Sequence, residues 1–428
     1  MIDNEVTLKK KEEKVVLLTN NFPYIPGEEF LENEITYLCK SFDEVIIIPV
    51  NFSGDKTKAK RPLPPNAIVV HIPNNKMKVR WMSKMLDLIK TLSDKQGRCW
   101  VLKDLNVATR LGITTLKKLL GMVSNGIKVR NFLLTNFISE NDNSIIYYSY
   151  WLNSSALALA MLKEDQQCLS AVSRAHGSDL YDYRHTPPYI PLQSDIIKYL
   201  DKLFVISKDG YKYLLNKDET LSNRVEISRL GTKYYKGNNN MESGNCLKIV
   251  TCSYMVKVKR LHLLIEALKN VKVKVEWRHI GDGELRDTLE ELAKSLPSNI
   301  SYLFLGHLSN QNVLNYYKNN KVDLFINVSS SEGVPVSIME ALSFGIPIIG
   351  TNVGGVPELV NEANGSLLEK EFLPKDLASK IEEFYYLSYL NKKKKSEEAL
   401  KTWNLLCNAD KNYKEFVNRI ETIRTINI

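Results

Sequence analysis

The sequence has little of the chemistry that metal centres and disulfide frameworks require. It contains six cysteines and six histidines among 428 residues, and no two cysteines form a C-x-x-C pair. No cluster of histidines lies beside any cysteine. Isolated cysteines of this kind are typical of reduced side chains that fill a protein core. We therefore expect neither a zinc site nor a disulfide framework.

Long apolar runs are also missing. A membrane-spanning helix needs roughly 18–20 consecutive apolar residues, and no stretch of the sequence approaches that length. The apolar stretch at residues 15–19 is too short to be the core of a signal peptide. We therefore expect a cytoplasmic protein. Its length exceeds that of one ordinary hydrophobic core, which indicates two domains.

Acidic residues are scarce in one basic segment. Residues 76–130 hold thirteen lysines or arginines and three aspartates, so thirteen minus three leaves +10 there, against +9 for the whole chain. Apolar side chains recur at helical spacing between the basic ones in residues 76–90. Such a helix either lies on an anionic membrane surface or packs on its own domain with a solvated basic face. No helix-turn-helix pattern accompanies the charge, so we expect no nucleic-acid partner.

Strand and helix patterns alternate along both halves of the chain, and a polar stretch at residues 235–245 separates the halves. The predicted strands are residues 15–19, 45–49, 145–148, 171–175, 203–207 and 225–228 in the first half, and 247–251, 273–280, 300–305, 324–327 and 346–349 in the second. This alternation predicts an α/β protein with two doubly wound Rossmann-like domains facing each other across a cleft.

The most informative segment is residues 330–358, SSEGVPVSIMEALSFGIPIIGTNVGGVPE, which places Glu332 and Glu340 on either side of a helix that Pro335 starts. The N–H groups of Val336, Ser337 and Ile338 then lack helical partners and suit a phosphate or diphosphate. Glu340 lies roughly 7.5 Å further along the helix axis. A carboxylate there could reach a ribose or sugar hydroxyl.

The setting of this helix favours a ligand site over two ordinary solvated acids. A predicted buried strand at residues 322–327 ends just before Glu332, and another follows at residues 346–350. The helix therefore begins at the carboxyl end of a strand, which is where open parallel sheets bind ligands.

These residues resemble the signature of the family 4 glycosyltransferases, which have the two-domain GT-B fold. Glu332 and Glu340 have the family's spacing, residues 345–347 supply its Gly-Pro step, and residues 354–358 supply its Gly-Gly-Val-Pro-Glu step. The resemblance implies a retaining hexosyltransferase that moves a sugar from a nucleotide diphosphate sugar to a glycan or lipid-linked acceptor. It also implies a role in cell-surface polysaccharide biosynthesis (capsule, exopolysaccharide or lipopolysaccharide), without a cofactor or an obligatory metal.

The same resemblance gives the domains their expected roles. Residues 1–235 would form the N-terminal, acceptor-side domain, and residues 246–390 the C-terminal domain that binds the nucleotide sugar. Residues 391–428 would form a helix that crosses back to the first domain. If the basic segment at residues 76–130 binds lipid, the protein would lie at the inner face of the cell membrane.

For the donor, the resemblance implies that Glu332 contacts the sugar and Glu340 the ribose hydroxyls. Backbone N–H groups of Gly333, Val334 and Val336 would then contact the diphosphate.

The loop at residues 252–260, which includes Ser253, would bring a cation to the diphosphate. Here Lys259 matches the family's lysine, while Arg260 replaces its glycine and Tyr254 stands in place of its arginine. Lys257 or Arg260 either substitutes for that arginine or is solvated.

Gly281 begins a G-D-G turn that is a near miss for a dinucleotide fingerprint, because Arg286 stands where the third glycine belongs. An NAD site is therefore not expected. The resemblance places Gly281 beside the nucleotide, although a tight turn without a ligand role fits equally well.

In the N-terminal half, the resemblance assigns two further residues. His176, in S-R-A-H-G-S-D, would form hydrogen bonds near the sugar or the acceptor, and Gly27 would approach the donor phosphates. Glu28 and Glu29 either bind a polar acceptor or simply begin the next helix.

Two other functions remain open for this sequence. One is a GT-B-fold sugar-nucleotide epimerase, and the other is a non-catalytic accessory subunit of a glycosyltransferase complex. A glycan phosphorylase would need a cofactor lysine environment and a much longer chain, and neither is visible in the sequence. The missing loop arginine favours the accessory role slightly, whereas the two glutamates, Lys259 and His176 oppose it.

Overall fold

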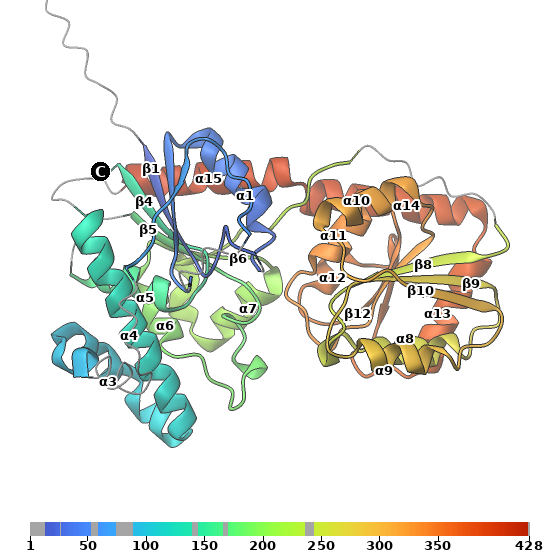
Figure 1. Ribbon diagram of the computed structural model, residues 1–428, viewed down its shortest axis with the longest axis horizontal. Coiled ribbons are helices and arrows are strands. Elements are labelled where there is room, and N and C mark those ends of the chain that lie inside the picture. Colours follow the sequence, from blue (N-terminus) through green and yellow to red (C-terminus); the bar gives the residue numbers. More distant parts are fainter. Residues whose placement is uncertain are drawn as a thin grey trace, which may run out of the picture. The chain divides into compact units, whose positions relative to one another are not determined.

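The computed structural model describes residues 13–25, 27–52, 59–73, 89–138, 144–165, 170–235 and 244–426. The chain forms two compact units, each with a parallel sheet of its own (Figure 1). The first unit comprises residues 1–206, 211–228 and 414–428, and the second comprises residues 207–210 and 229–413. The expected α/β class with two Rossmann-like domains is therefore confirmed.

The first sheet has seven strands in the order β3-β2-β1-β4-β5-β6-β7. They are β1 (Lys14–Thr19), β2 (Glu44–Pro49), β3 (Ala67–Val69), β4 (Ile145–Ser149), β5 (Ser170–Ala175), β6 (Lys202–Val205) and β7 (Val225–Ile227). In its centre, Val16 pairs with Ile46 of β2 and with Tyr147 of β4. The inner strands are buried along nearly their whole length, because helices cover both faces of a parallel sheet.

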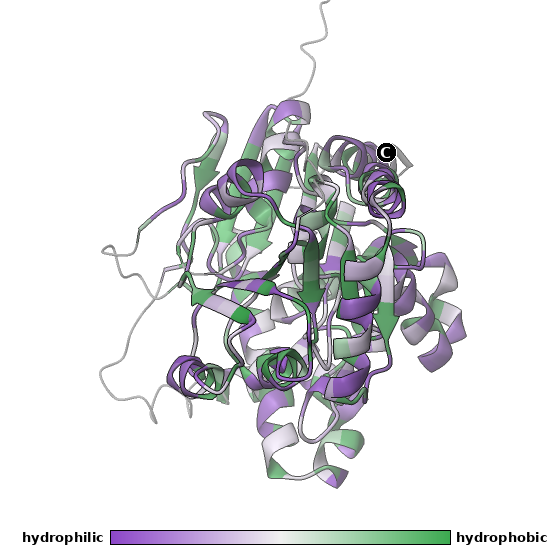
Figure 2. Cartoon of the chain, turned by 90° about the vertical axis from the view of Figure 1, so that its right-hand side faces the viewer, coloured by the Kyte–Doolittle hydropathy of each residue, from purple (hydrophilic) through white to green (hydrophobic). Residues whose placement is uncertain are grey.

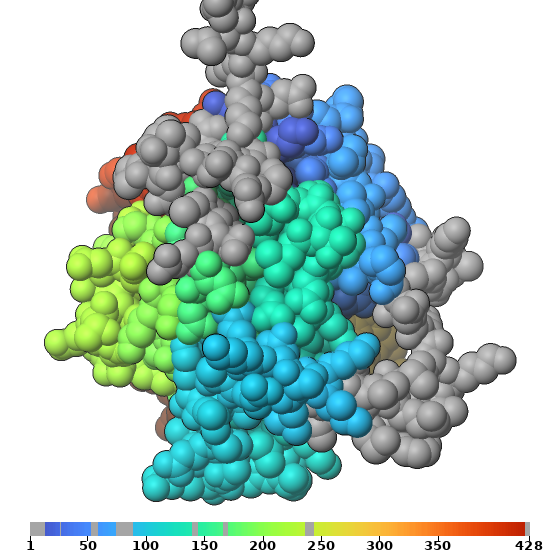
Figure 3. All heavy atoms as spheres, turned by 90° about the vertical axis from the view of Figure 1, so that its left-hand side faces the viewer, coloured from blue at the N-terminus to red at the C-terminus, as the bar shows by residue number. Residues whose placement is uncertain are grey.

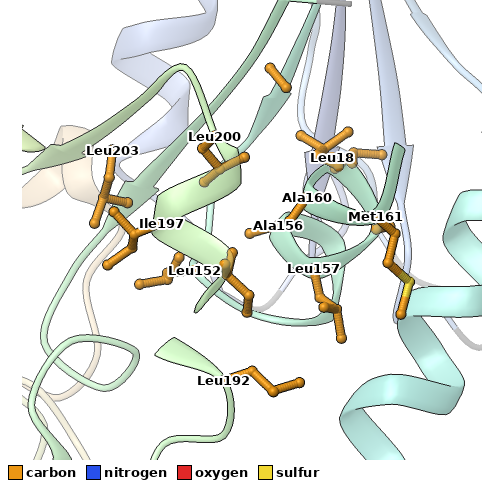
Figure 4. Close-up of a cluster of buried hydrophobic side chains, with 14 of the residues drawn as sticks. Leu18, Leu152, Ala156, Leu157, Ala160, Met161, Leu192, Ile197, Leu200 and Leu203 are labelled. Atoms are coloured by element: carbon orange, nitrogen blue, oxygen red, sulfur yellow. The ribbon is translucent and has the colours of Figure 1, made fainter. Parts of the chain in front are cut away.

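The helices of this unit are α1 (Leu31–Ser41), α3 (Lys95–Arg110), α4 (Ile113–Asn136), α5 (Ser154–Glu164), α6 (Gln193–Tyr199) and most of α7 (Lys208–Lys217) and α15 (Ala409–Ile426). Helix α5 is apolar on all sides and is almost entirely buried. Figure 4 shows Leu157 of α5, Leu18 of β1 and Ile197 of α6 in the resulting core. By contrast, α3 and α4 pack side by side at the surface, where Figure 3 shows them in blue-cyan.

Helix α15 is held in the first unit by a cation–π contact and by aromatic contacts of Phe416. The Phe416 ring lies 5.2 Å from the Tyr148 ring and 4.3 Å from the Arg174 guanidinium. Arg174 is fully buried, donates to the Tyr148 hydroxyl at 2.9 Å and pairs with Glu34 at 3.3 Å. Phe416 thus anchors the C-terminal helix against β4 and β5.

The second sheet has six strands in the order β10-β9-β8-β11-β12-β13. They are β8 (Leu247–Cys252), β9 (Val275–Ile280), β10 (Ile300–Phe304), β11 (Leu324–Asn327), β12 (Ile348–Thr351) and β13 (Gly365–Leu368). The helices are α8 (Leu261–Leu268), α9 (Arg286–Ala293), α10 (Asn310–Asn319), α11 (Val336–Ser343), α12 (Val356–Leu359), α13 (Pro374–Tyr386) and α14 (Tyr389–Leu406). Figure 2 shows the apolar central strands between helices that turn polar faces outward.

Two short strands were not predicted from the sequence. β3 has three residues and is only partly buried at the edge of its sheet, so it lacks a clear apolar pattern. β13 begins at Gly365, where an added Cβ would lie 1.9 Å from the carbonyl oxygen of Ile348. Among the described residues, no helix combines the length and the apolar character needed to cross a membrane.

Candidate functional site

In the second unit, the predicted site residues gather at the point where the strand order reverses. β8 and β11 are neighbours, yet the chain leaves β8 toward β9 and leaves β11 toward β12 on the opposite side. Such a switch point opens a crevice at the carboxyl ends of the strands, which is where these sheets bind ligands. The two loops also contact each other, since the Ser330 N–H donates to the Val258 carbonyl at 2.8 Å.

Two of the predicted donor residues form an ion pair between these two loops. The Lys259 Nζ lies 2.6 Å from Oε1 of Glu332, which also accepts a hydrogen bond from Asn327 at 3.3 Å. The Glu332 side chain is about nine-tenths buried, whereas that of Lys259 is about one-fifth exposed. A cation and a hydrogen-bond acceptor are therefore available within one small site.

Helix α11 begins one residue later than the sequence predicts. Pro335 has an extended ψ of 118° and is the N-cap, so Val336 is the first helical residue. The Pro335 carbonyl accepts a hydrogen bond from the Ile338 N–H at 3.1 Å. This removes Ile338 from the expected set of free N–H donors. Within the described part of the chain, Val336 and Ser337 keep N–H groups without an acceptor. They lie at the positive end of the helix dipole, directly after the loop that carries Glu332.

The Gly-Gly step of the motif shapes the loop that carries Glu332 and Gly333. A Cβ on Gly354 would lie 2.0 Å from the Glu332 carbonyl oxygen, and Gly354 has a φ of +52°. The Gly355 N–H donates to the Gly333 carbonyl at 2.7 Å. Only glycines allow the β12–α12 loop to lie this close. The motif therefore fixes the backbone around Val334, which is itself buried.

Glu340 is 5% exposed, and its carboxylate accepts a hydrogen bond from the side-chain amide of Asn310 at the start of α10. Burial raises the pKa of Glu340 to about 7, and the Asn310 hydrogen bond opposes this rise. The titratable groups that face it are Tyr235, Cys252 and Tyr317, which are all neutral at pH 7. No lysine or arginine of the described segments pairs with Glu340. It is therefore a buried acceptor without a cation.

The remaining cations of the β8–α8 loop differ in their contacts. Arg260 adopts the left-handed conformation at a φ of +50°, which explains why glycine is the family's residue there. Its guanidinium donates to the carbonyls of Val328 and Lys370 at 2.8 and 2.7 Å and so ties down the β11–α11 loop. Lys257 is exposed, and so is Tyr254. The ligand roles of Lys257 and Arg260 stay predictions.

Gly281 lies against the same loop. It has a φ of +139°, and an added Cβ would approach the Ser253 carbonyl oxygen to 1.9 Å. Its N–H donates to Gly306 at 2.8 Å, and the N–H of Met255 donates to the Asp282 carbonyl at 2.9 Å. The turn after β9 therefore supports Ser253 and its neighbours. A contact of Gly281 or Ser253 with the nucleotide stays a prediction.

Gly27 and His176 belong to the first unit. His176 follows β5, is 6% exposed, and lies among the rings of Phe30, Tyr150 and Trp151 at centroid distances of 5.6, 4.8 and 4.5 Å. Its backbone N–H donates to Asp179 at 2.7 Å. Neither ring nitrogen has a hydrogen-bond partner among the described residues. Its Nδ1 lies 3.9 Å from Oδ2 of Asp179, which is too long for a hydrogen bond. A buried imidazole without hydrogen bonds is costly for folding alone, and the role of His176 near the sugar or acceptor stays a prediction.

The loop after β1 owes its shape to Glu28. This buried carboxylate accepts from the N–H groups of Asn20, Asn21 and Phe22 at 2.6–2.9 Å and from the Trp151 indole at 2.6 Å. These four donors occupy Glu28, so it closes the loop and is not available to an acceptor. Gly27, at a φ of +101°, turns the chain just before it.

Two polar residues of the site were missed from the sequence. Asn310 lies outside every motif, and only its place at the start of a helix after Ser309 marks it. Asn327 ends the predicted strand before Glu332, so the rule that ligands lie at strand ends could have found it. Among the described residues, no cluster of His, Cys, Asp or Glu has a geometry that could hold a metal ion.

Comparison with solved structures identifies the fold class of the chain. The apo structure of the lipopolysaccharide outer core galactosyltransferase WaaB is similar with a TM-score of 0.67, covering 96% of this chain and 99% of WaaB at 14% identity. At that identity the likeness shows the fold alone, and the fold is that of the GT-B glycosyltransferases.

The sequence comparisons then identify the family. The profile described as "Glycosyl transferases group 1" matches residues 240–412. The putative colanic acid biosynthesis glycosyltransferase WcaL of Salmonella typhimurium is 22% identical over 385 residues, or 87% of this chain and 90% of WcaL. The O-antigen biosynthesis glycosyltransferase WbnH of Escherichia coli is 31% identical over 254 residues, or 56% of this chain and 67% of WbnH. The chain belongs to the group 1 glycosyltransferases and is an enzyme of that kind.

Proposed function

We propose that the protein is a retaining glycosyltransferase that takes its sugar from a nucleotide diphosphate sugar bound in the second unit. The observation that carries this proposal is the cluster of polar groups at the switch point of the second sheet. It combines the Lys259–Glu332 pair, the free N–H groups of Val336 and Ser337, and the buried acceptor Glu340. These groups match the diphosphate, sugar and ribose of one elongated ligand.

Each of these groups has its own role in the proposed reaction. Lys259 and the N-terminus of α11 stabilise the negative charge that develops on the leaving diphosphate. Because protein groups supply this positive potential, we expect no obligatory metal or cofactor. Glu332 accepts hydrogen bonds from the sugar, and Glu340 accepts them from the ribose. His176 donates or accepts near the sugar or acceptor, and on a retaining path the leaving phosphate takes the acceptor proton.

The proposed acceptor follows from the names of two similar proteins. WcaL is named for colanic acid biosynthesis and WbnH for O-antigen biosynthesis. We extend this to a glycan or lipid-linked acceptor in the biosynthesis of a cell-surface polysaccharide.

Variants at the two glutamates test the donor site. Purified protein is titrated with UDP, GDP, ADP and TDP, and turnover is measured with the corresponding sugar nucleotides. Glu340→Gln should lose nucleotide binding. Glu332→Gln should lose turnover, yet bind the nucleoside diphosphate roughly five-fold more tightly because Lys259 no longer has a competing partner.

Glu291→Gln is the matched control, since Glu291 is an exposed acid of the same unit whose one ion pair among the described residues is with Lys294. It should leave both measurements unchanged. Wild-type behaviour of both site variants would refute the assignment, and a wild-type protein that binds no nucleotide would favour an accessory subunit. The configuration of the product at the anomeric carbon, read by NMR, tests the retaining outcome.

We also propose that the basic segment holds the protein at the inner face of the cell membrane. Lys78, Arg80 and Lys84 lie outside the described residues, but α3 and α4 add exposed Leu102 and Ile113 at the surface. Apolar side chains among basic ones suit an anionic bilayer surface.

Sedimentation with phosphatidylglycerol vesicles tests this membrane role. Binding should fall in the variant Arg98→Glu/Arg110→Glu/Lys117→Glu, whose changed residues are all exposed. A charge reversal elsewhere, Lys294→Glu, should have no effect. Equal sedimentation of all three proteins would contradict membrane binding through this surface.

A further inference from the structure

Three aromatic side chains from three separate loops meet beyond the carboxyl ends of the strands of the first sheet. Tyr24 follows β1, Phe52 follows β2 and His71 follows β3, so all three lie beyond the carboxyl ends of neighbouring parallel strands. The Tyr24 and Phe52 rings are stacked, with centroids 3.9 Å apart and planes 14° apart. The Tyr24 hydroxyl lies 3.1 Å from Nε2 of His71. We call these three residues the aromatic platform.

The platform keeps ring faces that none of its own members covers. Stacking uses one face of Tyr24 and one face of Phe52. The His71 centroid lies 5.0 Å from Phe52 and 5.8 Å from Tyr24, so His71 sits beside the stack and over neither outer face. Tyr24 and Phe52 are half-buried and His71 is exposed. An aromatic group that served packing alone would be buried, as the large side chains of the core are.

Polar groups lie next to the platform. Arg61 is 6% exposed and donates to the Tyr24 carbonyl at 3.3 Å. It also lies 3.5 Å from Glu29 and is hydrogen-bonded to Glu32, and both carboxylates remain nearly half exposed, at 48% and 47%. Their remaining lone pairs are open to solvent. Burial, assisted by Lys60, lowers the pKa of His71, so its imidazole is neutral at pH 7.

Apolar ring faces bordered by exposed hydrogen-bond acceptors suit a sugar ring. A pyranose has an apolar C–H face that packs on an aromatic ring, and a rim of hydroxyls that donate to carboxylates. We propose that the aromatic platform is a binding subsite for a pyranose unit of an oligosaccharide acceptor. This inference rests on the proposed function in one respect, namely that the enzyme transfers a sugar to a glycan acceptor, with the first unit as the acceptor side that the resemblance implies.

The place of the platform in the sheet tells which unit of the acceptor it binds. Phe52 follows β2 and His176 follows β5, and the order β2-β1-β4-β5 separates these strands by three strand spacings. At about 4.8 Å each, this is roughly 14 Å. Such a distance exceeds a single sugar ring. If the reacting hydroxyl lies near His176, the platform binds a sugar of the oligosaccharide acceptor that is further from that hydroxyl. The enzyme would then be selective for the length of its acceptor.

Saturation-transfer NMR with defined sugars tests the platform. The probes are maltohexaose, cellohexaose and chitohexaose, each compared with the methyl glycoside of its own repeating sugar. Wild-type protein should bind at least one hexasaccharide more tightly than its monosaccharide. Tyr24→Leu and Phe52→Leu keep the apolar volume of the loops but remove the ring faces. Each should reduce hexasaccharide affinity about ten-fold and leave monosaccharide affinity unchanged.

The matched control is Phe137→Leu, which changes another half-buried aromatic residue of the same unit. Phe137 follows α4 and precedes β4, so it lies toward the amino ends of the strands. It should not alter sugar binding. Thermal melts identify any variant that fails to fold, and the second variant then carries the test.

Two results would overturn the platform: hexasaccharide affinity in folded Tyr24→Leu and Phe52→Leu equal to wild type, or no gain from chain length for any of the three sugars. Nucleotide binding by the second unit is measured on the same samples. If the platform variants leave sugar affinity unchanged while nucleotide still binds, the platform proposal is refuted and the proposed glycosyl transfer is not.

Discussion

Replacing Glu340 with glutamine should stabilise the protein at alkaline pH while it abolishes nucleotide binding. Glutamine has nearly the same shape, and its side-chain carbonyl still accepts the hydrogen bond from Asn310. What the substitution removes is a buried negative charge that no cation pairs with among the described residues. Removing a residue that is kept for function at the expense of stability is expected to stabilise the folded protein.

The magnitude follows from the pKa of Glu340, which burial raises from 4.5 to about 7. Below pH 4.5 the carboxyl is protonated in both the folded and unfolded states, so it does not affect stability. Between pH 4.5 and 7 the unfolded chain ionises first, and the folded state loses relative stability. Above pH 7 the loss is complete, and a shift of this size corresponds to on the order of 3 kcal/mol.

Thermal denaturation from pH 4.5 to 8.5 measures this effect. The melting temperature of Glu340→Gln minus that of wild type should rise across this range by roughly 6–12 °C, on the scale of a unit of this size. Glu291→Gln, at an exposed position, should show no such trend. A difference that does not vary with pH, or a variant less stable than wild type at pH 8.5, would refute the reasoning.

Four further outcomes are expected. Asn310→Ala should raise the pKa of Glu340 further, measured by carboxyl NMR, because the amide hydrogen bond that opposes the rise is lost; an unchanged pKa would contradict this. Gly354→Ala should cost about 1–2 kcal/mol in urea unfolding through backbone strain, before any clash is counted. Glu28→Ala should cost about 2 kcal/mol or more, since four N–H donors lose their acceptor. Phe416→Ala should cost about 3–5 kcal/mol and loosen α15 in hydrogen exchange.

The sheet of the second unit was largely predictable, because its strands are short apolar runs between turn residues. Residues 247–251 and 324–327 matched β8 and β11 closely. Their adjacency, however, is a property of the strand order, which no local pattern contains. The sequence could therefore predict that Glu332 follows a strand, but not that Lys259 lies 2.6 Å from it.

Glycines and glutamates illustrate a second limit. The motif marked Gly354 as a family residue, yet its physical reason is a contact with the Glu332 backbone that appears only once β12 and β11 are paired. Glu28 left two readings open because its four donors come from residues 20–22 and from Trp151, which is distant in sequence. Contacts between distant segments decide such cases, and one-dimensional patterns do not record them.

The two glutamates of the motif occupy opposite electrostatic settings, and this difference suggests how donor binding proceeds. Glu332 is neutralised by Lys259, whereas the titratable groups that face Glu340 in the described segments are neutral. A diphosphate that attracts Lys259 must draw it away from Glu332, and the freed carboxylate then becomes available to the sugar hydroxyls. Nucleotide without a sugar would leave Glu332 buried and unpaired, which is costly. We therefore expect a sugar nucleotide to bind more tightly than its nucleoside diphosphate, and this preference should vanish in Glu332→Gln.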